Sequence, residues 1–309
     1  MSLRKISFLI LSFVLVMVSC DEDDTVNTFE PLDLEEKRDT DDATLLNYLK
    51  THYYNAGDFN SDNTNINNIE ITEIEEGGNV PTGNALLMEV VETKSFTFED
   101  IIYPYYVLSI NQGGGTNSPK FCDNVLIAYE GFRVVDDAVF DSRLNPNPSI
   151  LDLTGTIEAW KLIIPEFNTA AESIDNGDGT ISYNDSGLGM MFLPAGLGYL
   201  FNNTNALQLQ PLAFKFELIK AFENDHDNDG VPSYLEELTD DLTFSVFAED
   251  AGLDDDTDGD GVPDYFDADD DGDGVLTINE DLNGDGDPTN DIGKNGKPNY
   301  LDPEETASK

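Results

Sequence analysis

Basic residues are scarce in this sequence. Its 309 residues include 15 Lys and Arg against 63 Asp and Glu, which gives a formal net charge of −48. This imbalance excludes a nucleic-acid partner, because phosphate recognition needs a basic surface. Uniform acidity would indicate disorder, but 39% hydrophobic and 10% aromatic residues are enough for a folded core. The length allows about two domains plus tails.

The N-terminus has the pattern of an export signal. Arg4 and Lys5 precede an apolar run over residues 6–18, which is too short to span a membrane comfortably. We therefore expect a signal peptide at residues 1–19. The following "MVSC" resembles a bacterial lipobox, which implies a lipid anchor at Cys20 and attachment to the membrane. An ordinary signal peptide that happens to contain Cys20 is the alternative.

The residues after Cys20 also indicate an exported lipoprotein. "CDEDD" resembles the acidic surface-export tag of Bacteroidetes lipoproteins. The sequence thus predicts an exported lipoprotein of the outer membrane, on its periplasmic or surface face. Cys122 is then the one cysteine left, so it cannot form an internal disulfide and is interpreted as a small core residue.

The first third of the mature chain shows no catalytic pattern. Residues 20–42 are acidic and poor in apolar side chains, and we interpret them as a tether. Residues 43–104 are interpreted as an ancillary N-terminal segment of a helix plus strands. The helix is expected in "DDATLLNYLKTHYYN", with Asp41 or Asp42 as its cap. Strands are expected in "ALLMEVVETK" and "YYVLSINQGGG".

The centre of the chain predicts an α+β fold. "NVLIAYEGFRVV" and "FKFELIK" alternate apolar and polar residues, as strands with one buried face do. Between them, "IEAWKLIIPEF" has the apolar spacing of a helix that Pro165 keeps short or kinks. An antiparallel sheet wrapped over one short helix accommodates these segments.

Five segments in this region resemble, in order and rough spacing, the FKBP-type peptidyl-prolyl isomerases. They are "YEG", "VFDS", "TIEAW", "FLPAGLGY" and "LAFKFELIK", and the resemblance covers residues 105–222. It implies an FKBP-like domain that acts on proline-containing polypeptides without a cofactor for catalysis.

The resemblance also assigns a site. It implies a proline pocket with Trp160 as its floor, the pocket aspartate at Asp141, a substrate-binding backbone N–H at Ile157 and a ligand-binding hydroxyl at Tyr199, and its remaining aromatic walls are Tyr129, Phe140 and Phe214. Such a pocket suits the reaction, because rotation about an X-Pro bond has a barrier of about 20 kcal/mol and needs no nucleophile. The alternative is that these aromatic residues only form a core.

Several positions depart from the family pattern. An insertion lies around residues 168–187, and its "NGDGT" is expected to be a turn rather than a calcium loop. Ala159 replaces the usual Gly before the tryptophan. The flap "LFNNTNALQLQP" lacks a proline-rich tip, and Ala206, Leu207 and Leu209 are candidates for its apolar contact. These changes bear on rate and ligand preference more than on the fold.

The C-terminal residues 225–303 repeat the pattern D-x-D-x-D-G. Ca²⁺ takes six to eight oxygen ligands, which a loop supplies at positions 1, 3, 5, 7, 9 and 12, with Gly at position 6 for the sharp turn. Three loops match, and their expected ligands are Asp225, Asp227, Asp229 and Glu236; Asp256, Asp258, Asp260, Asp264 and Asp267; and Asp269, Asp271, Asp273 and Glu280. Weaker matches begin at Asp281 and Asp291.

These loops predict a calcium-binding repeat segment with structural Ca²⁺. "DGDGVPDYFDADDDGDGV" resembles thrombospondin type 3 repeats, in which loops follow one another without long helices. "YLEELTDD" after the first loop is expected to form a helix, as in half of an EF-hand. A disordered acidic tail is the alternative.

The sequence therefore predicts a lipid-anchored peptidyl-prolyl cis-trans isomerase that acts on exported polypeptides and has calcium-stabilised C-terminal repeats. Two other classes stay open. One is a peptide-binding module without turnover. The other is a calcium-dependent structural or adhesion protein of the cell surface, in which the central domain is a spacer.

Overall fold

A computed structural model describes residues 32–60, 62–202, 205–239, 242–246 and 254–308. The expected signal peptide, Cys20 and most of the expected tether lie outside these residues. From Leu34 onward the chain forms one unit. Within the described residues, no helix combines the length and the apolar character needed to cross a membrane.

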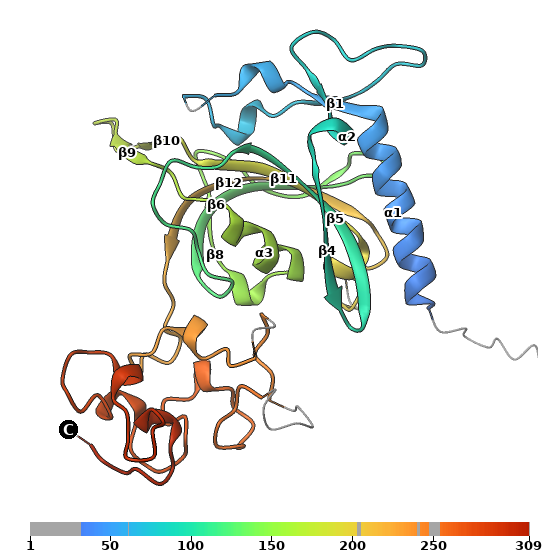
Figure 1. Ribbon diagram of the computed structural model, residues 1–309. Coiled ribbons are helices and arrows are strands. Elements are labelled where there is room, and N and C mark those ends of the chain that lie inside the picture. The colour runs from blue at the N-terminus through green and yellow to red at the C-terminus, as the bar shows by residue number, and fades with distance from the viewer. Residues whose placement is uncertain (1–31, 61, 203–204, 240–241, 247–253, 309) are drawn as a thin grey trace, which may run out of the picture. The chain divides into compact units, whose positions relative to one another are not determined.

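A seven-stranded antiparallel sheet forms the centre of the fold (Figure 1). In spatial order its strands are β4 (Glu92–Phe98), β5 (Ile101–Asn111), β11 (Gly187–Leu193), β12 (Leu212–Phe222), β6 (Asn124–Arg133) and β7 (Val139–Arg143), and β8 (Ser149–Asp152) also pairs with β6. The alternating segments of the sequence became β6 and β12, which pair with each other.

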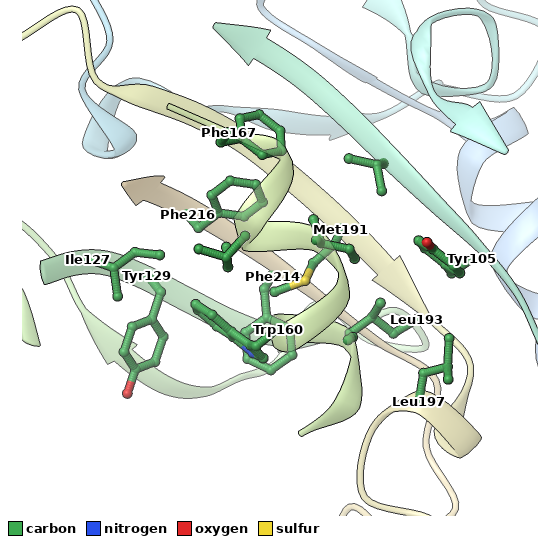
Figure 2. Close-up of a cluster of buried hydrophobic side chains, with 14 of the residues drawn as sticks. Tyr105, Ile127, Tyr129, Trp160, Phe167, Met191, Leu193, Leu197, Phe214 and Phe216 are labelled. Atoms are coloured by element: carbon green, nitrogen blue, oxygen red, sulfur yellow. The ribbon is translucent and has the colours of Figure 1, made fainter. Parts of the chain in front are cut away.

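The sheet curves around the short helix α3 (Glu158–Ile163) (Figure 1). Pro165 follows in a one-turn 3₁₀-helix (Ile164–Glu166), so the helix is short, as expected. Side chains of α3 and of the facing strands form the first core cluster (Figure 2), which includes Trp160, Phe167 and Phe216. The α+β prediction, with an antiparallel sheet and few helices, is confirmed.

The opposite face of the sheet carries a second core. It is covered by α1 (Leu34–Thr51), the small sheet of β1 (His52–Tyr54), β2 (Ile71–Glu73) and β3 (Ala85–Leu86), and α2 (Leu87–Val90). Leu45, Leu49 and Leu87 are fully buried against Met190 and Phe192 of β11. The segment 43–104 therefore contributes to this second core and also supplies β4 and part of β5.

Two elements of this segment differ from expectation. Helix α1 begins at Leu34, upstream of the expected cap, so it includes residues 34–42, which were interpreted as tether. Asp41 is buried within the helix instead of capping it, where it pairs with Lys37 and accepts a hydrogen bond from Ala195 N at 2.9 Å. "ALLMEVVETK" contains β3, α2 and the start of β4 rather than one strand. Only Glu89 and Glu92 interrupt its apolar residues, so the segment has no clear periodicity to distinguish these forms.

The insertion is a hairpin of β9 (Glu172–Asp175) and β10 (Ile181–Asn184). The expected turn at "NGDGT" joins them, with Asn176 N donating to Thr180 O at 3.1 Å. The prediction of a turn is confirmed.

After β12, the residues that the structure describes form a series of loops with single 3₁₀ turns. These turns are Ser233–Leu235, Asp264–Phe266, Thr277–Asn279, Pro288–Asn290 and Asn299–Leu301. The expected helix in "YLEELTDD" is wrong in the part that the structure describes, where only the first of these turns forms. Glu236 ends that turn and is buried rather than continuing on a solvated helix face.

Candidate functional site

A cavity of about 620 Å³ opens beside α3. Six of the seven residues expected in the pocket line it: Tyr129, Asp141, Ile157, Trp160, Tyr199 and Phe214. They come from β6, β7, the N-terminal cap of α3, α3 itself, the loop after β11 and β12. Segments that are far apart in the sequence thus meet in one concave site.

Two edge-to-face contacts fix the aromatic wall. The Trp160 ring is 5.5 Å from Tyr129 and 5.4 Å from Phe214, with near-perpendicular planes (Figure 2). Trp160 is 4% exposed, so it forms a deep surface rather than a rim. Edge-to-face pairs are favourable and orient both rings. The cavity therefore has a rigid aromatic lining.

Phe140, the seventh expected residue, lies behind this lining. Its ring packs perpendicular to Phe214 at 5.5 Å, and it does not line the cavity. A glycine makes this packing possible, because a Cβ on Gly131 would lie 2.6 Å from both rings. Phe140 thus supports the wall instead of forming it.

The polar groups of the cavity converge on Asp141. Tyr129 Oη donates to Asp141 Oδ2 at 2.9 Å, and Ser142 N donates to Oδ1 at 2.8 Å. Burial and this hydrogen bond raise the pKa of the Tyr129 hydroxyl to about 12. Burial and the charge of Asp141 also raise the pKa of Tyr199. Both hydroxyls therefore remain protonated and able to donate at neutral pH.

Two aromatic residues of the cavity lining were not predicted from the sequence. Phe98 and Phe201 form an edge-to-face pair at 5.4 Å and both line the cavity. Phe98 belongs to β4, within the segment interpreted as ancillary, and the alternation in "SFTFED" is the signal that could have pointed to it. In the flap, Leu207 packs on the first core cluster, whereas Leu209 is 50% exposed.

A second candidate site is a cluster of buried carboxylates in the C-terminal loops. Oxygens of Asp227, Asp229, Glu236 and Asp270 lie within 4.8 Å of one another. Asp229, Glu236 and Asp270 are each 1% exposed. Both oxygens of Glu236 and one of each aspartate have no hydrogen-bond partner. Burial and mutual repulsion raise the pKa of Glu236 and of Asp270 to about 10.

Asp270 was not expected in this cluster. It comes from the third loop, where it occupies an even-numbered position that the ligand spacing passes over. The first loop supplies the other three residues, so the cluster joins two loops. Unneutralised carboxylates in such a place are costly unless a cation or protons compensate them.

Two further acidic groups match the other loops. They consist of Asp256, Asp258 and Asp260, and of Asp269, Asp271 and Asp273. Glu280 is fully buried, and neither of its oxygens has a hydrogen-bond partner. Burial, and next the charge of Asp271, raise the pKa of Glu280 to about 8. All the donors are carboxylate oxygens, the type that hard cations such as Ca²⁺ prefer.

Besides Glu280, three expected ligands belong to none of these groups, and they form hydrogen bonds within the loops. Asp225 accepts from Gly230 N at 3.2 Å, Asp264 accepts from Thr257 N at 2.7 Å, and Asp267 accepts from Asp269 N at 3.0 Å.

Cys122 is fully buried, as expected, and burial raises the pKa of its thiol to about 12.

Comparison with known proteins gives the following similarities. A family model described as BamM C-terminal matches residues 226–283. A solved peptidyl-prolyl cis-trans isomerase from Pseudomonas syringae pv. tomato is similar over 62% of this chain and 98% of its own, with 13% identity and a TM-score of 0.32. FkpA from Escherichia coli is similar over 41% of this chain and 51% of its own, with 19% identity and a TM-score of 0.31. No curated protein matches by sequence.

Proposed function

We propose that the cavity binds proline-containing polypeptides and catalyses cis-trans exchange of the X-Pro bond. The observation that carries this proposal is the Trp160 surface, held edge to face by Tyr129 and Phe214 beside protonated hydroxyls and a carboxylate. The order of the sequence segments that resemble FKBP-type isomerases supports it independently.

The chemistry requires positioning rather than a nucleophile. Rotation removes the amide resonance of the X-Pro bond and reduces its charge separation, so an apolar surface favours the twisted amide over the planar one. In this mechanism the pyrrolidine ring lies on Trp160. The Ile157 N–H and the Tyr199 hydroxyl donate to substrate carbonyls on either side of the rotating bond. Asp141 holds Tyr129 and contributes a negative field beside the amide.

A prolyl-isomerisation assay on the mature chain with X-Pro tetrapeptides tests the proposal. Asp141→Ala and Tyr199→Phe each remove about one hydrogen bond or charge contact and should lower kcat/KM about five- to tenfold while the fold persists. Asp39→Ala and Tyr183→Phe are matched controls on the surface of α1 and β10, and should leave the rate unchanged. A wild-type rate equal to the uncatalysed rate would exclude the enzyme.

The assay also separates the two remaining classes. A module that binds peptide without turnover would show no rate enhancement, but a proline peptide would change Trp160 fluorescence. A surface protein in which the central domain is a spacer would show neither effect and would keep only its cation binding.

We also propose that the C-terminal loops bind Ca²⁺. The supporting observation is the set of buried, unpartnered oxygens of Asp229, Glu236 and Asp270. Calorimetric titration with calcium should lose one site in Glu236→Gln and keep it in Glu237→Gln, which changes the neighbouring and less buried carboxylate. An identical titration for the two variants would exclude Glu236 as a ligand.

We also propose that the protein carries a lipid anchor at Cys20, and this proposal rests on the N-terminal sequence alone. Cys20→Ser should move the protein from the membrane fraction to the soluble fraction, and mass spectrometry of the wild type should find acyl chains. A wild type that is soluble and not acylated would leave secretion by an ordinary signal peptide.

A further inference from the structure

We propose that the first acidic loop, residues 225–236, positions the wall of the pocket through a contact between His226 and Asp152. This inference rests on the proposed isomerase and calcium functions. It assigns the coupling between them to His226 and Asp152. His226 lies between Asp225 and Asp227 in the sequence, so its backbone belongs to the loop whose carboxylates face Asp270.

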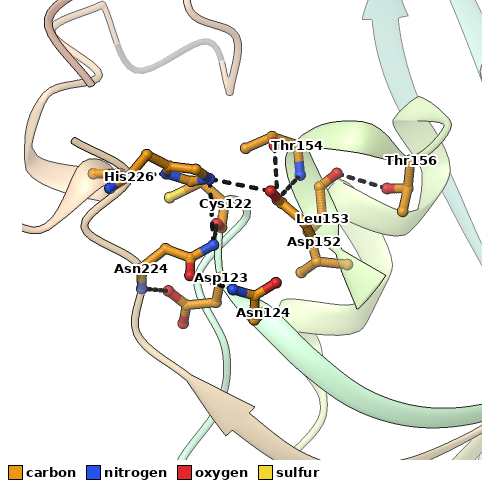
Figure 3. Close-up of polar contacts among 10 residues, drawn as sticks. Cys122, Asp123, Asn124, Asp152, Leu153, Thr154, Thr156, Asn224 and His226 are labelled. Carbon is orange, nitrogen blue, oxygen red and sulfur yellow. Dashed lines mark hydrogen bonds and ion pairs between the residues drawn. The ribbon is translucent and has the colours of Figure 1, made fainter. Parts of the chain in front are cut away.

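His226 links the loop to the central domain (Figure 3). Its Nε2 lies 3.1 Å from Asp152 Oδ2, and its Nδ1 lies 2.8 Å from Ser233 Oγ. One tautomer satisfies both contacts, with Nε2–H donating to Asp152 and Ser233 Oγ–H donating to Nδ1. The ring is thus held from within the loop and directed at the domain.

Asp152 connects the His226 contact to the pocket. Its other oxygen, Oδ1, accepts from Thr154 N at 2.9 Å and from Thr154 Oγ1 at 2.7 Å, which caps the 3₁₀ turn Leu153–Gly155 (Figure 3). The turn continues directly into the cavity wall, which includes Gly155, Thr156 and Ile157. One carboxylate therefore holds the loop histidine with one oxygen and the pocket wall with the other.

Neighbouring contacts fix the same junction. Asn224 Nδ2 donates to Cys122 O at 2.9 Å, and Asn224 N donates to Asp123 Oδ1 at 3.3 Å. Asp123 O in turn accepts from Leu153 N at 3.1 Å, at the start of the capped turn. The His226 ring also packs edge to face on Tyr265 of the second loop, at 5.1 Å.

A cation in the first loop would strengthen this junction. Without neutralisation, the carboxylates of Asp227, Asp229 and Glu236 repel one another in a buried place, which favours an opened loop. Bound Ca²⁺ reverses the repulsion and fixes the backbone around His226. Coupling between two such sites is commonly worth about a fivefold change in affinity or more. We therefore expect calcium to raise kcat/KM about fivefold by holding Ile157 in place.

The experiment uses the full mature chain, with calcium or magnesium as the only added ligand. Trp160 is the only tryptophan in the sequence, so its emission reports the pocket without any need for turnover. In the wild type, calcium should shift this emission and raise kcat/KM about fivefold, whereas magnesium should do neither, because it holds its waters in an octahedral shell.

Variants then separate the contact from general folding. His226→Ala should still bind calcium by calorimetry, but Trp160 emission and kcat/KM should no longer respond. His226→Gln keeps an amide donor toward Asp152 and should restore part of the response. Asn228→Gly is the control in the same loop, because Asn228 is exposed and already has a φ of 64°. It should behave as the wild type.

The outcomes distinguish this inference from the proposed function. If His226→Ala keeps the full calcium response, or if calcium does not bind the wild type, the coupling is wrong. If the wild type catalyses equally with and without calcium and Trp160 emission does not change, the coupling is wrong and the isomerase function is retained. If no catalysis occurs but calcium changes Trp160 emission through His226, the coupling stands and the isomerase fails.

Discussion

At the scale of single residues, Gly131 shows how closely the pocket wall is packed. A methyl group there would overlap both Phe140 and Phe214 at 2.6 Å. Gly131→Ala should therefore lower the free energy of unfolding by about 1–3 kcal/mol, as overpacking does. Urea denaturation measures the change. Gly155→Ala is a matched control, since a Cβ there meets no atom within 4 Å, and it should stay within about 0.5 kcal/mol of the wild type.

Glu217 gives a prediction for pH. It is 3% exposed on the second face of β12, where it accepts hydrogen bonds from Ile66 N and Asn145 Nδ2. Burial raises its pKa above the ordinary value of 4.5. The folded state therefore binds a proton more tightly than the unfolded state, and the associated stability is present at low pH and lost as pH rises through the folded pKa.

Glu217→Gln removes this titration and keeps an oxygen acceptor for Ile66 N. Relative to the wild type, the variant should gain stability as pH rises from 4 toward neutrality. Urea denaturation of both proteins at several pH values measures the difference. A constant difference across this range would contradict a raised pKa in the fold.

The sequence predicted individual pocket residues better than it predicted carboxylate partners. Trp160 and Asp141 were assigned to the pocket because the segments around them resemble FKBP-type isomerases in order and spacing, and both line the cavity. Asp270 was missed because it joins the first loop from the third, and such a contact leaves no regular spacing. Phe140 was assigned to the lining. In the structure, the missing side chain at Gly131 leaves room for the Phe140 ring to pack against Phe214, outside the lining.

At the scale of elements, α1 tests whether the N-terminal segment is part of the folded unit. Leu49 is fully buried in the second core cluster. Leu49→Ala should lower the free energy of unfolding by about 2–5 kcal/mol. The loss should be visible in Trp160 fluorescence, although Trp160 lies on the other face of the sheet, because both cores share the same strands.

Asn47→Ala, on the exposed side of α1, is the control and should change stability little. If Leu49→Ala left the Trp160 transition unchanged while helix content fell separately, the N-terminal segment would unfold independently of the sheet.

The strand expected in "YYVLSINQGGG" is correct as part of β5, and the central elements that the sequence predicted have a clear period. β6 and β12 alternate, and α3 has helical spacing that ends near Pro165. The segment "ALLMEVVETK" has neither period, and β3, α2 and β4 could not be separated in it. The second core was missed because Lys215 and Glu217 make that face of β12 look solvated, whereas Lys215 pairs with Glu130 and Glu217 accepts from Ile66 N.

At the scale of the whole molecule, we expect removal of calcium to affect the two parts of the chain differently. In chelator, residues 225–303 should become sensitive to protease, while a core of about residues 34–222 should persist because its two hydrophobic clusters draw on none of the acidic loops. Calcium at a hundredfold excess over its dissociation constant should stabilise the folded form by about 2.7 kcal/mol per independent site.

Limited proteolysis in calcium, magnesium or chelator measures this difference. Digestion that is identical in all three, together with no calcium bound, would mean that the loops are held without metal. The acidic charge would then serve another purpose, such as solubility.

The strand order has a consequence for the timing of folding during synthesis. β12 is the last strand of the sheet to be made, yet it lies between β11 and β6 near the middle. Until Phe222 has emerged, the edges of β11 and β6 that pair with β12 in the finished sheet stay unpaired, and neither core can be completed. Folding must therefore wait for nearly the whole domain, and a chain interrupted before Leu212 leaves an open template for aggregation rather than a smaller folded protein.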